Sequence, residues 1–375
     1  MDCQNISSLI SNFVDNFIDF TVCGIFLPQP TNPSPPPQTI FPSPPRLVAI
    51  GDFHGDYPKS TQAMTLAGIL DPATHRWSGG SSFMVQVGDI FDRGGNEIKL
   101  IYLLHRLKHE ATLAGGNLVT ILGNHEVMNM NYDFRYVTRE GLIEFERWGW
   151  WFKKGMDMKK LGGDEDVRDV FDGLPVSFEG VERKYWNGFR ARMAALRPNG
   201  PIASRFLQDY KTVAVVGDSV FVHGGLLKEH VEHGLEKINS EVRDWIRGSP
   251  TTKTTKCPDY LLGGLSVVWL RKFSYGSNCD CEQLQSILSS IPGAARMVMG
   301  HTIQREGINS VCDNQALRID VGLSKGCGNG IPEVLEITGG KEIRILTSNL
   351  LYRRSDPVPD KKKAEFLAPE VGVKA

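Results

Sequence analysis

The chain has little of what marks a membrane-spanning, secreted or nucleic-acid-binding protein. Its 375 residues carry a formal net charge of −1, which gives no electrostatic reason to bind nucleic acid or an anionic membrane. No apolar run approaches the roughly 18 residues of a transmembrane helix. The first residues contain Asp15 and Asp19 within their apolar stretch and no arginine before Arg46, so they predict neither a secretory nor a transit signal. We therefore expect a cytoplasmic location.

Cysteine is also sparse. Seven cysteines are scattered over the chain, and an odd number in a long chain does not predict a secreted disulfide framework. No pair has the spacing of a zinc ribbon. Cys279 and Cys281, with Cys257 nearby, could act on a redox partner, whereas the alternative is free cytosolic thiols. The redox interpretation fits the mitochondrial intermembrane space, which is the alternative location.

The chain divides into four segments. Apolar residues recur at helical spacing from Ile6 to Ile18, which predicts an amphipathic helix within residues 1–27 that docks on its own domain rather than on a membrane. Nine prolines in residues 28–45 predict an extended linker. A catalytic domain is expected over residues 46–352. Three prolines and a run of three lysines predict a solvated tail over residues 353–375.

The expected catalytic domain has the pattern of an α/β sandwich. Short apolar runs, each ended by glycine, predict buried strands, and a helix is predicted between the second and third strands, over 97–114. Residues 131–209 differ from the rest, being rich in Arg, Lys, Trp and Phe, and predict a helical insert. The predicted strands cover 47–50, 82–87, 117–122, 212–216, 220–222, 296–299, 316–320, 333–337 and 343–346.

Five of the turns that follow these runs carry residues that bind metals. Loops at the ends of strands can bring residues from distant parts of a sequence to one point. An aspartate beside glycine is an ordinary turn residue, but five such turns in one chain point to a shared site. The turns are Gly51-Asp52-Phe53-His54-Gly55, Gly88-Asp89-Ile90-Phe91-Asp92-Arg93-Gly94, Gly123-Asn124-His125-Glu126, His223-Gly224-Gly225 and Gly300-His301-Thr302.

This set of residues suits phosphoester hydrolysis. Two divalent ions about 3.5–4 Å apart can neutralise phosphoryl oxygens and generate a nucleophile from water at neutral pH. A carboxylate can bridge both ions, and imidazole and amide groups can complete their coordination. The mixture of oxygen and nitrogen ligands without thiolate favours Mn, Fe or Zn over a structural zinc held by cysteine. We expect Mn first, with Fe or Zn as alternatives.

The five turns resemble the GDxHG, GDxxDRG, GNHE, HGG and GH signatures of the PPP phosphoprotein phosphatases, which belong to the calcineurin-like metallophosphoesterases. The resemblance covers roughly residues 46–350 and implies a β-sandwich flanked by helices, acting on phosphoproteins through a hydroxide that bridges two metals. It implies that Asp52 and His54 hold the first metal and that Asp89 bridges. Asn124, His223 and His301 would then hold the second metal.

The same resemblance assigns the other catalytic roles. It implies that His125 protonates the leaving oxygen, that Asp92 orients His125, and that Arg93 grips the phosphate. A second phosphate-binding arginine is expected, with Arg271 as the candidate and Arg135 as the alternative.

The last third of the chain departs from the eukaryotic PPP enzymes. Residues 320–326 read DVGLSKG in place of a SAPNY-like motif. This feature and the long insert resemble the bacterial-like Shewanella-like phosphatases found in plants and some protists. We expect phosphotyrosine to be at least as good a substrate as phosphoserine or phosphothreonine, with a substrate wall lined by Trp or Phe. Trp148, Trp150 and Trp151 are the candidates for this wall, and the alternative is that they pack the core of the insert.

Two other functions fit part of the pattern. A nucleotide phosphohydrolase of the diadenosine tetraphosphatase type would use the same metal ligands with a base-stacking pocket. A catalytically inactive phosphopeptide-binding module would have lost a ligand or the acid, but all of these residues are present.

Overall fold

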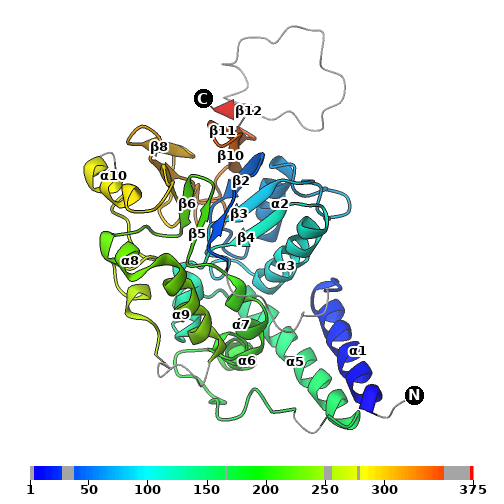
Figure 1. Ribbon diagram of the computed structural model, residues 1–375. Coiled ribbons are helices and arrows are strands. Elements are labelled where there is room, and N and C mark those ends of the chain that lie inside the picture. The colour runs from blue at the N-terminus through cyan, green and yellow to red at the C-terminus, as the bar shows by residue number, and fades with distance from the viewer. Residues whose placement is uncertain are drawn as a thin grey trace.

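Two six-stranded sheets form the centre of the molecule (Figure 1). The computed structural model describes residues 4–27, 38–164, 167–248, 256–276, 279–349 and 372–374. One sheet has the strand order β1-β5-β6-β7-β9-β8, and the other has the order β12-β11-β10-β2-β3-β4. The α/β sandwich predicted from the sequence is confirmed.

The strands of the second sheet bring three predicted turns to one edge. β2 (Arg46–Ile50), β3 (Phe83–Gln86) and β4 (Asn117–Thr120) run parallel to one another. Parallel neighbours end at the same edge of a sheet, so the turns after these strands converge. β10 (Glu333–Thr338) and β11 (Glu342–Thr347) extend this sheet as an antiparallel hairpin.

The first sheet brings the other two turns to the site. β6 (Ser219–Val222) pairs antiparallel with β5 (Val213–Val216) and parallel with β7 (Arg296–Met299). The turns after β6 and β7 therefore leave the sheet at the same edge. β9 (Ala316–Arg318) and β8 (Asn309–Val311) complete this sheet as an antiparallel pair.

Helices cover both sheets (Figure 1). α3 is amphipathic in sequence and contacts β4, while α9 contacts β5. The helices outside the insert and the N-terminal segment are α2 (Tyr57–Leu66), α3 (Glu97–Leu113), α4 (Asn124–Met130), α8 (Lys228–His233), α9 (Leu235–Arg247), η3 (Asp259–Leu261) and α10 (Cys281–Ser289).

The predicted insert is helical, as expected from its sequence. Its elements are α5 (Arg139–Leu161), η1 (Arg183–Tyr185), α6 (Trp186–Leu196), α7 (Pro201–Arg205) and η2 (Leu207–Asp209). α5 and α6 pack closely because Gly188 lies against the carbonyl group of Leu142, where any Cβ atom would collide. The two longest helices of the insert are therefore held together by a tight helix–helix contact.

The predicted N-terminal helix forms and docks on the insert. α1 (Gln4–Cys23) packs along α5, where Val14 and Ile18 face Gly155. Asp19 is fully buried and accepts two hydrogen bonds from Arg205, at 2.6 and 2.7 Å. A buried carboxylate is stable only when it is paired, so this ion pair fixes the register of the helix on the insert. The expectation of docking on the chain's own domain is confirmed.

Two predicted segment boundaries are wrong. Residues 28–37 of the predicted linker lie outside the described residues, but Ile40–Phe41 forms β1, which pairs with β5 in parallel. The sandwich therefore begins before residue 46. Most of the predicted tail also lies outside the described residues, yet Gly372–Lys374 forms β12 against β11. A proline-rich composition cannot reveal such short strands, because their pairing depends on a distant partner. No described helix is long and apolar enough to cross a membrane.

Candidate dimetal centre

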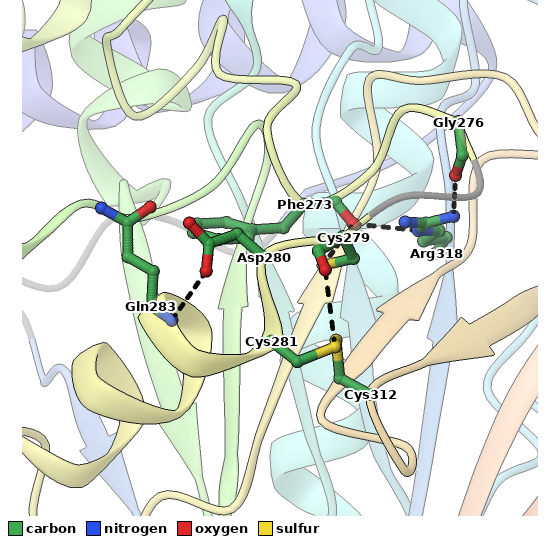
Figure 2. Close-up of a disulfide and its surroundings, with 8 residues drawn as sticks. All are labelled: Phe273, Gly276, Cys279, Asp280, Cys281, Gln283, Cys312 and Arg318. Atoms are coloured by element: carbon green, nitrogen blue, oxygen red, sulfur yellow. Dashed lines mark hydrogen bonds between the residues drawn. A yellow bond between two sulfur atoms is a disulfide. The ribbon is translucent and has the colours of Figure 1, made fainter.

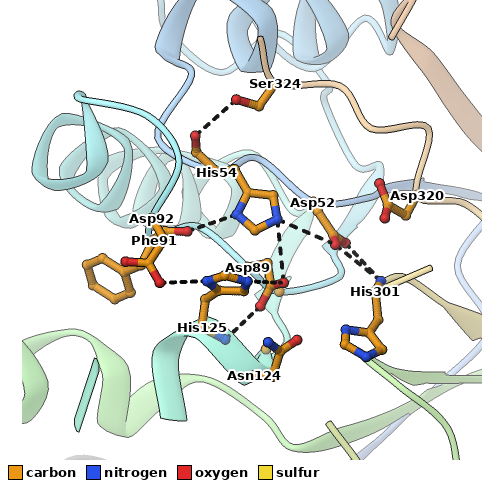
Figure 3. Close-up of polar contacts among 12 residues, drawn as sticks. Asp52, His54, Asp89, Phe91, Asp92, Asn124, His125, His301, Asp320 and Ser324 are labelled. Atoms are coloured by element: carbon orange, nitrogen blue, oxygen red, sulfur yellow. Dashed lines mark hydrogen bonds and ion pairs between the residues drawn. The ribbon is translucent and has the colours of Figure 1, made fainter. Parts of the chain in front are cut away.

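The five turns predicted from the sequence meet at one buried point. Figure 3 shows residues of four of them. All six predicted ligands are at most 7% exposed. Asp52 and His54 follow β2, and Asp89 follows β3. The other ligands follow β4, β6 and β7, and they are Asn124, His223 and His301.

Asp89 lies at the centre of this cluster. Its Oδ2 atom is 3.6 Å from Nε2 of His54 and 3.2 Å from Nε2 of His223. It belongs to two groups whose ligand atoms lie within 4.8 Å of one another, one with His54 and His125 and one with His223 and His301. A carboxylate shared by two groups is what a bridging ligand requires. The geometry therefore agrees with the bridging role expected for Asp89.

The second group contains a side-chain atom that lacks a partner. Nε2 of His301 is buried and makes no hydrogen bond within the described residues. Burial and the neighbouring His223 lower the pKa of His301 to about 2, so the ring is neutral and offers a lone pair. The ring of His223 lies 5.0 Å away, and its Nε2 atom is 2.9 Å from Oδ1 of Asn124. An unpaired imidazole nitrogen beside amide and carboxylate oxygens fits a divalent metal.

The charges of three neighbouring carboxylates also indicate a site for divalent metals. Asp52, Asp89 and Asp320 are all buried. Burial and repulsion by Asp320 and Asp89 raise the pKa of Asp52, while burial is the main cause that raises the pKa of Asp320 to about 6. Divalent cations would relieve this repulsion. The sequence analysis placed Asp320 in a stretch that departs from the PPP pattern but did not recognise it as part of the site.

The backbone of the site is held in an unusual conformation. His54, Asp89, Asp92, Arg93 and His301 all have φ between +44° and +67°. Residues with a Cβ atom rarely adopt this region, and such strain gathers at functional sites.

Glu126 holds the strained loop after β3 in place. Its carboxylate accepts hydrogen bonds from the backbone N–H groups of Asp89, Ile90, Phe91 and Gly123, at 2.7–3.2 Å. One side chain thus satisfies four backbone donors. The sequence analysis quoted Glu126 within a signature but gave it no role. These contacts position Asp89 and the two residues that follow it.

His125 and Asp92 form the expected acid and orienting pair. Nδ1 of His125 lies 2.6 Å from Oδ2 of Asp92, and Nε2 points towards Oδ2 of Asp89 at 3.8 Å. Burial disfavours the charged ring, but Asp89 and Asp92 outweigh it and raise the pKa of His125 above its usual range. The ring can therefore carry a proton at neutral pH and present it on Nε2.

The orienting aspartate has a further partner that the sequence analysis missed. Arg192 of α6 is fully buried, and its Nη2 atom lies 2.9 Å from Oδ1 of Asp92. The same guanidinium donates to Asn129 at 2.7 Å and to Glu97. Burial works to raise the pKa of Asp92, but His125 and Arg192 hold it below its usual range. Arg192 therefore keeps Asp92 ionised and fixes its orientation.

The predicted phosphate-binding arginines differ in the residues that they contact. The Arg93 guanidinium lies 4.5 Å over the ring of Tyr136, whose ring is 5.2 Å from that of His125. Arg271 donates to the carbonyl of His301 and to Thr302 Oγ1, both at 2.9 Å, so it lies beside a metal ligand. Arg135 instead pairs with Asp133 at the surface. The structure therefore favours Arg271 over Arg135 as the second arginine.

The predicted tryptophan wall is wrong. Trp148 is 1% exposed and packs in the core against Phe152. Trp151 contacts Phe17 of α1, and Trp150 contacts Trp151. The helical spacing identified an apolar face correctly, but it could not tell a core-facing side from a substrate-facing one. The aromatic ring beside His125 is instead that of Tyr136, which is 37% exposed.

The cysteines pair differently from the expectation. Cys281 forms a disulfide with Cys312, which ties the start of α10 to the β8–β9 hairpin (Figure 2). Cys279 is free beside it, and Cys257 is free and buried elsewhere. Burial raises the pKa of Cys257 to about 11 and is the main cause that raises the pKa of Cys279. Low-pKa thiols are the reactive ones, so the structure gives no support to a redox partner at these two residues.

Comparisons with known proteins agree with this site. The model of the calcineurin-like phosphoesterase family matches residues 45–305. The chain is 55% identical to Shewanella-like protein phosphatase 2 of Arabidopsis thaliana, over 96% of the chain and 93% of the relative. It is 26% identical to Shewanella-like protein phosphatase 1 of Plasmodium berghei, over 79% of the chain and 72% of the relative. The crystal structure of a cold-active protein-tyrosine phosphatase from a psychrophilic Shewanella species has a similar fold, with a TM-score of 0.56 at 20% identity and 86% of each chain covered.

The geometry of His125 predicts a loss of turnover on substitution. His125→Asn removes the proton at Nε2, and general acids typically contribute ~10²–10⁴-fold to turnover. We expect kcat to fall by that order on an alkyl phosphate, and by much less on an aryl phosphate whose leaving oxygen needs little protonation. Steady-state kinetics with elemental analysis measures both effects. Equal losses on the two substrates, or loss of bound metal, would contradict the assignment.

The buried contacts of Arg192 predict a related effect. Arg192→Lys keeps the charge but cannot reach Asp92, Asn129 and Glu97 together. We expect kcat to fall by about 10–100-fold with little change in KM, by analogy with other partners that orient catalytic side chains. The fall should depend on the leaving group as it does for His125→Asn. A loss of stability with unchanged kcat per folded molecule would show that Arg192 is only structural.

Proposed function

Because the chain belongs to the calcineurin-like phosphoesterases and, within them, to the Shewanella-like protein phosphatases, we propose that it removes phosphate from phosphoproteins and accepts phosphotyrosine at least as well as phosphoserine or phosphothreonine. Its membership makes it a metal-dependent protein phosphatase. The observation that carries the proposal is the convergence of six metal-ligand side chains and the Asp92–His125 pair on Asp89.

Each residue of the site has one role in the proposed reaction. Asp52 and His54 would hold one metal, Asn124, His223 and His301 the other, and Asp89 both. When bound, the two ions neutralise charge on the phosphoryl group and supply a nucleophile at neutral pH. Manganese is the first expectation from the oxygen and nitrogen ligands, with iron or zinc as alternatives.

The protein's own groups act on the leaving side of the phosphate. Nε2 of His125 donates a proton to the leaving oxygen, because Asp92 fixes the ring through Nδ1. Arg192 keeps that carboxylate ionised and in place. Arg93 and Arg271 flank the cluster and are placed to hold phosphoryl oxygens.

Selectivity for the residue that carries the phosphate must come from the surroundings of the site. Tyr136 supports the phosphotyrosine part of the proposal, since its ring is 37% exposed and lies between Arg93 and the ring of His125. An aromatic ring in that place can stack on the phenyl ring of a substrate, and such pairs contribute about 0.5–1.5 kcal/mol beyond simple burial. An aliphatic phosphothreonine gains no such contact.

The nucleotide phosphohydrolase function remains the second candidate from the sequence. It requires a pocket in which a base can stack, and Tyr136 is the exposed ring near His125. The 55% identical relative carries the name of a protein phosphatase, which supports the phosphoprotein alternative. Activity on dinucleoside polyphosphates but not on phosphopeptides would favour the nucleotide function.

Matched peptides that differ only in the phosphorylated residue test the proposal. With defined Mn, we expect kcat/KM for phosphotyrosine to equal or exceed that for phosphothreonine. Tyr136→Ala should lower kcat/KM for phosphotyrosine by about fivefold, as the loss of roughly 1 kcal/mol of ring contact implies, and should affect phosphothreonine less. Trp150→Ala is the control, because Trp150 lies on the exposed side of α5 against Trp151 and should not alter selectivity. A tenfold preference for phosphothreonine in the unaltered enzyme would overturn the proposal.

Location is proposed from the disulfide. Disulfides persist in oxidising compartments and are rare in the cytoplasm. The Cys281–Cys312 bond therefore supports the mitochondrial intermembrane space over the cytoplasm as the location of the protein. The test uses protein taken from its own cells, with its thiols trapped by acid. We expect Cys281 and Cys312 to resist alkylation until a reductant is added. Cys279 serves as the control because it is free. If Cys281 and Cys312 react at once, the cytoplasmic prediction stands.

A further inference from the structure

One face of the molecule, remote in sequence from the site loops, is apolar and uncovered. Figure 1 shows α1 alongside α5 at the edge of the molecule, next to the N-terminus. Leu9, Phe13 and Phe20 of α1 are 64%, 65% and 50% exposed, and Trp150 of α5 is 55% exposed. These residues, together with Phe17 and Trp151, are here called the α1–α5 face.

The aromatic rings of this face form a continuous surface across the two helices. Phe17 contacts Trp151 edge-on at 5.6 Å between ring centres, and Trp151 contacts Trp150 at 4.5 Å. Phe13, Phe17 and Phe20 recur at helical spacing on one side of α1, which is the side turned away from Val14 and Ile18. Exposed apolar patches of this kind mark interaction sites.

The acidic residues of α1 do not belong to the face. Asp15 pairs with Lys159 at 2.7 Å, and Asp19 is buried against Arg205. Both are therefore neutralised on the side of α1 that meets the insert. The sequence analysis counted these two charges against membrane contact, but the structure buries Asp19 and pairs the partly exposed Asp15 with Lys159.

Basic residues border the face on α5. Between residues 147 and 160 the exposed charged residues of α5 are Arg147, Lys153, Lys154, Asp157 and Lys160. Lys154 lies 5.9 Å over the ring of Trp150, and Arg147 donates to the carbonyl of Thr21 at 3.1 Å. Aromatic rings next to Lys and Arg are typical of helices that lie in the interface of an anionic membrane.

We propose that the α1–α5 face docks the enzyme on an anionic lipid surface. The rings would enter the boundary between headgroups and acyl chains, and the basic residues would meet lipid phosphates. A second copy of the chain fits less well, because two-fold symmetry would bring this predominantly basic border against itself. None of the metal ligands lies in the face, so docking leaves the catalytic site open.

Vesicle flotation tests the proposal with the full-length protein. We expect flotation with phosphatidylcholine vesicles that contain phosphatidylserine, weaker flotation with phosphatidylcholine alone, and release by salt. Phe13→Ser combined with Phe20→Ser should weaken binding by about tenfold or more, since binding scales with the apolar area inserted. Arg147→Glu combined with Lys154→Glu should abolish the preference for phosphatidylserine. Val176→Ser, which removes an apolar side chain 70% exposed elsewhere, is the control and should bind normally.

Turnover of a small aryl phosphate shows that each variant is folded, because the substituted residues lie outside the catalytic site. The proposal is overturned if the unaltered protein stays unbound with anionic vesicles, or if the Phe13→Ser/Phe20→Ser variant floats as well as the control. Analytical sedimentation tests whether a second copy of the chain binds the α1–α5 face instead. A dimer that dissociates in that variant, without vesicle binding by the unaltered protein, would identify the face as a contact between copies of the chain.

Discussion

The need to compensate buried negative charge organises this protein. Asp52, Asp89, Asp92, Glu97 and Asp320 are all at most 3% exposed within one region. Burying a carboxylate costs several kcal/mol unless it is paired, protonated or bound to a metal. Asp89 has histidines around it, and Asp92 has Arg192 and His125. Asp52 and Asp320 have no paired cation among the described residues, and it is at these two that divalent metal would complete the balance of charge.

The helical insert supplies counter-charges on both of its sides. Arg192 of α6 points inward to Asp92 and Glu97, and Arg205 at the end of α7 pairs with Asp19 of α1. Burial raises the pKa of Glu97 to about 7 even though Arg192 opposes the change. One fully buried arginine is therefore shared by two fully buried acids. The insert thus links the orientation of the catalytic acid to the packing of the same helices that carry α1.

Local patterns predicted much of this arrangement, because the relevant physics is local. A buried strand followed by a turn with Asp, Asn or His is visible in the sequence, and it located the six side chains that the structure brings together and the neighbouring Asp92–His125 pair. The amphipathic period of α1 was equally clear. Long-range pairings were not visible. Arg192 lies 100 residues from Asp92, β1 is a two-residue strand defined by its partner β5, and the spacing of cysteines could not indicate that Cys281 pairs with Cys312.

The tryptophans show why a correct pattern can lead to a wrong role. Trp148, Trp150 and Trp151 occupy three directions around α5, since successive helical residues are separated by about 100°. One enters the core, one meets α1 and one faces outward. Composition alone treats them as one aromatic wall, but the register of α5 against α1 and α6 separates them. That register depends on Gly155 and Gly188, whose missing side chains admit Ile18 and the Leu142 backbone. These two glycines therefore help to determine which aromatic rings of α5 are buried and which face outward.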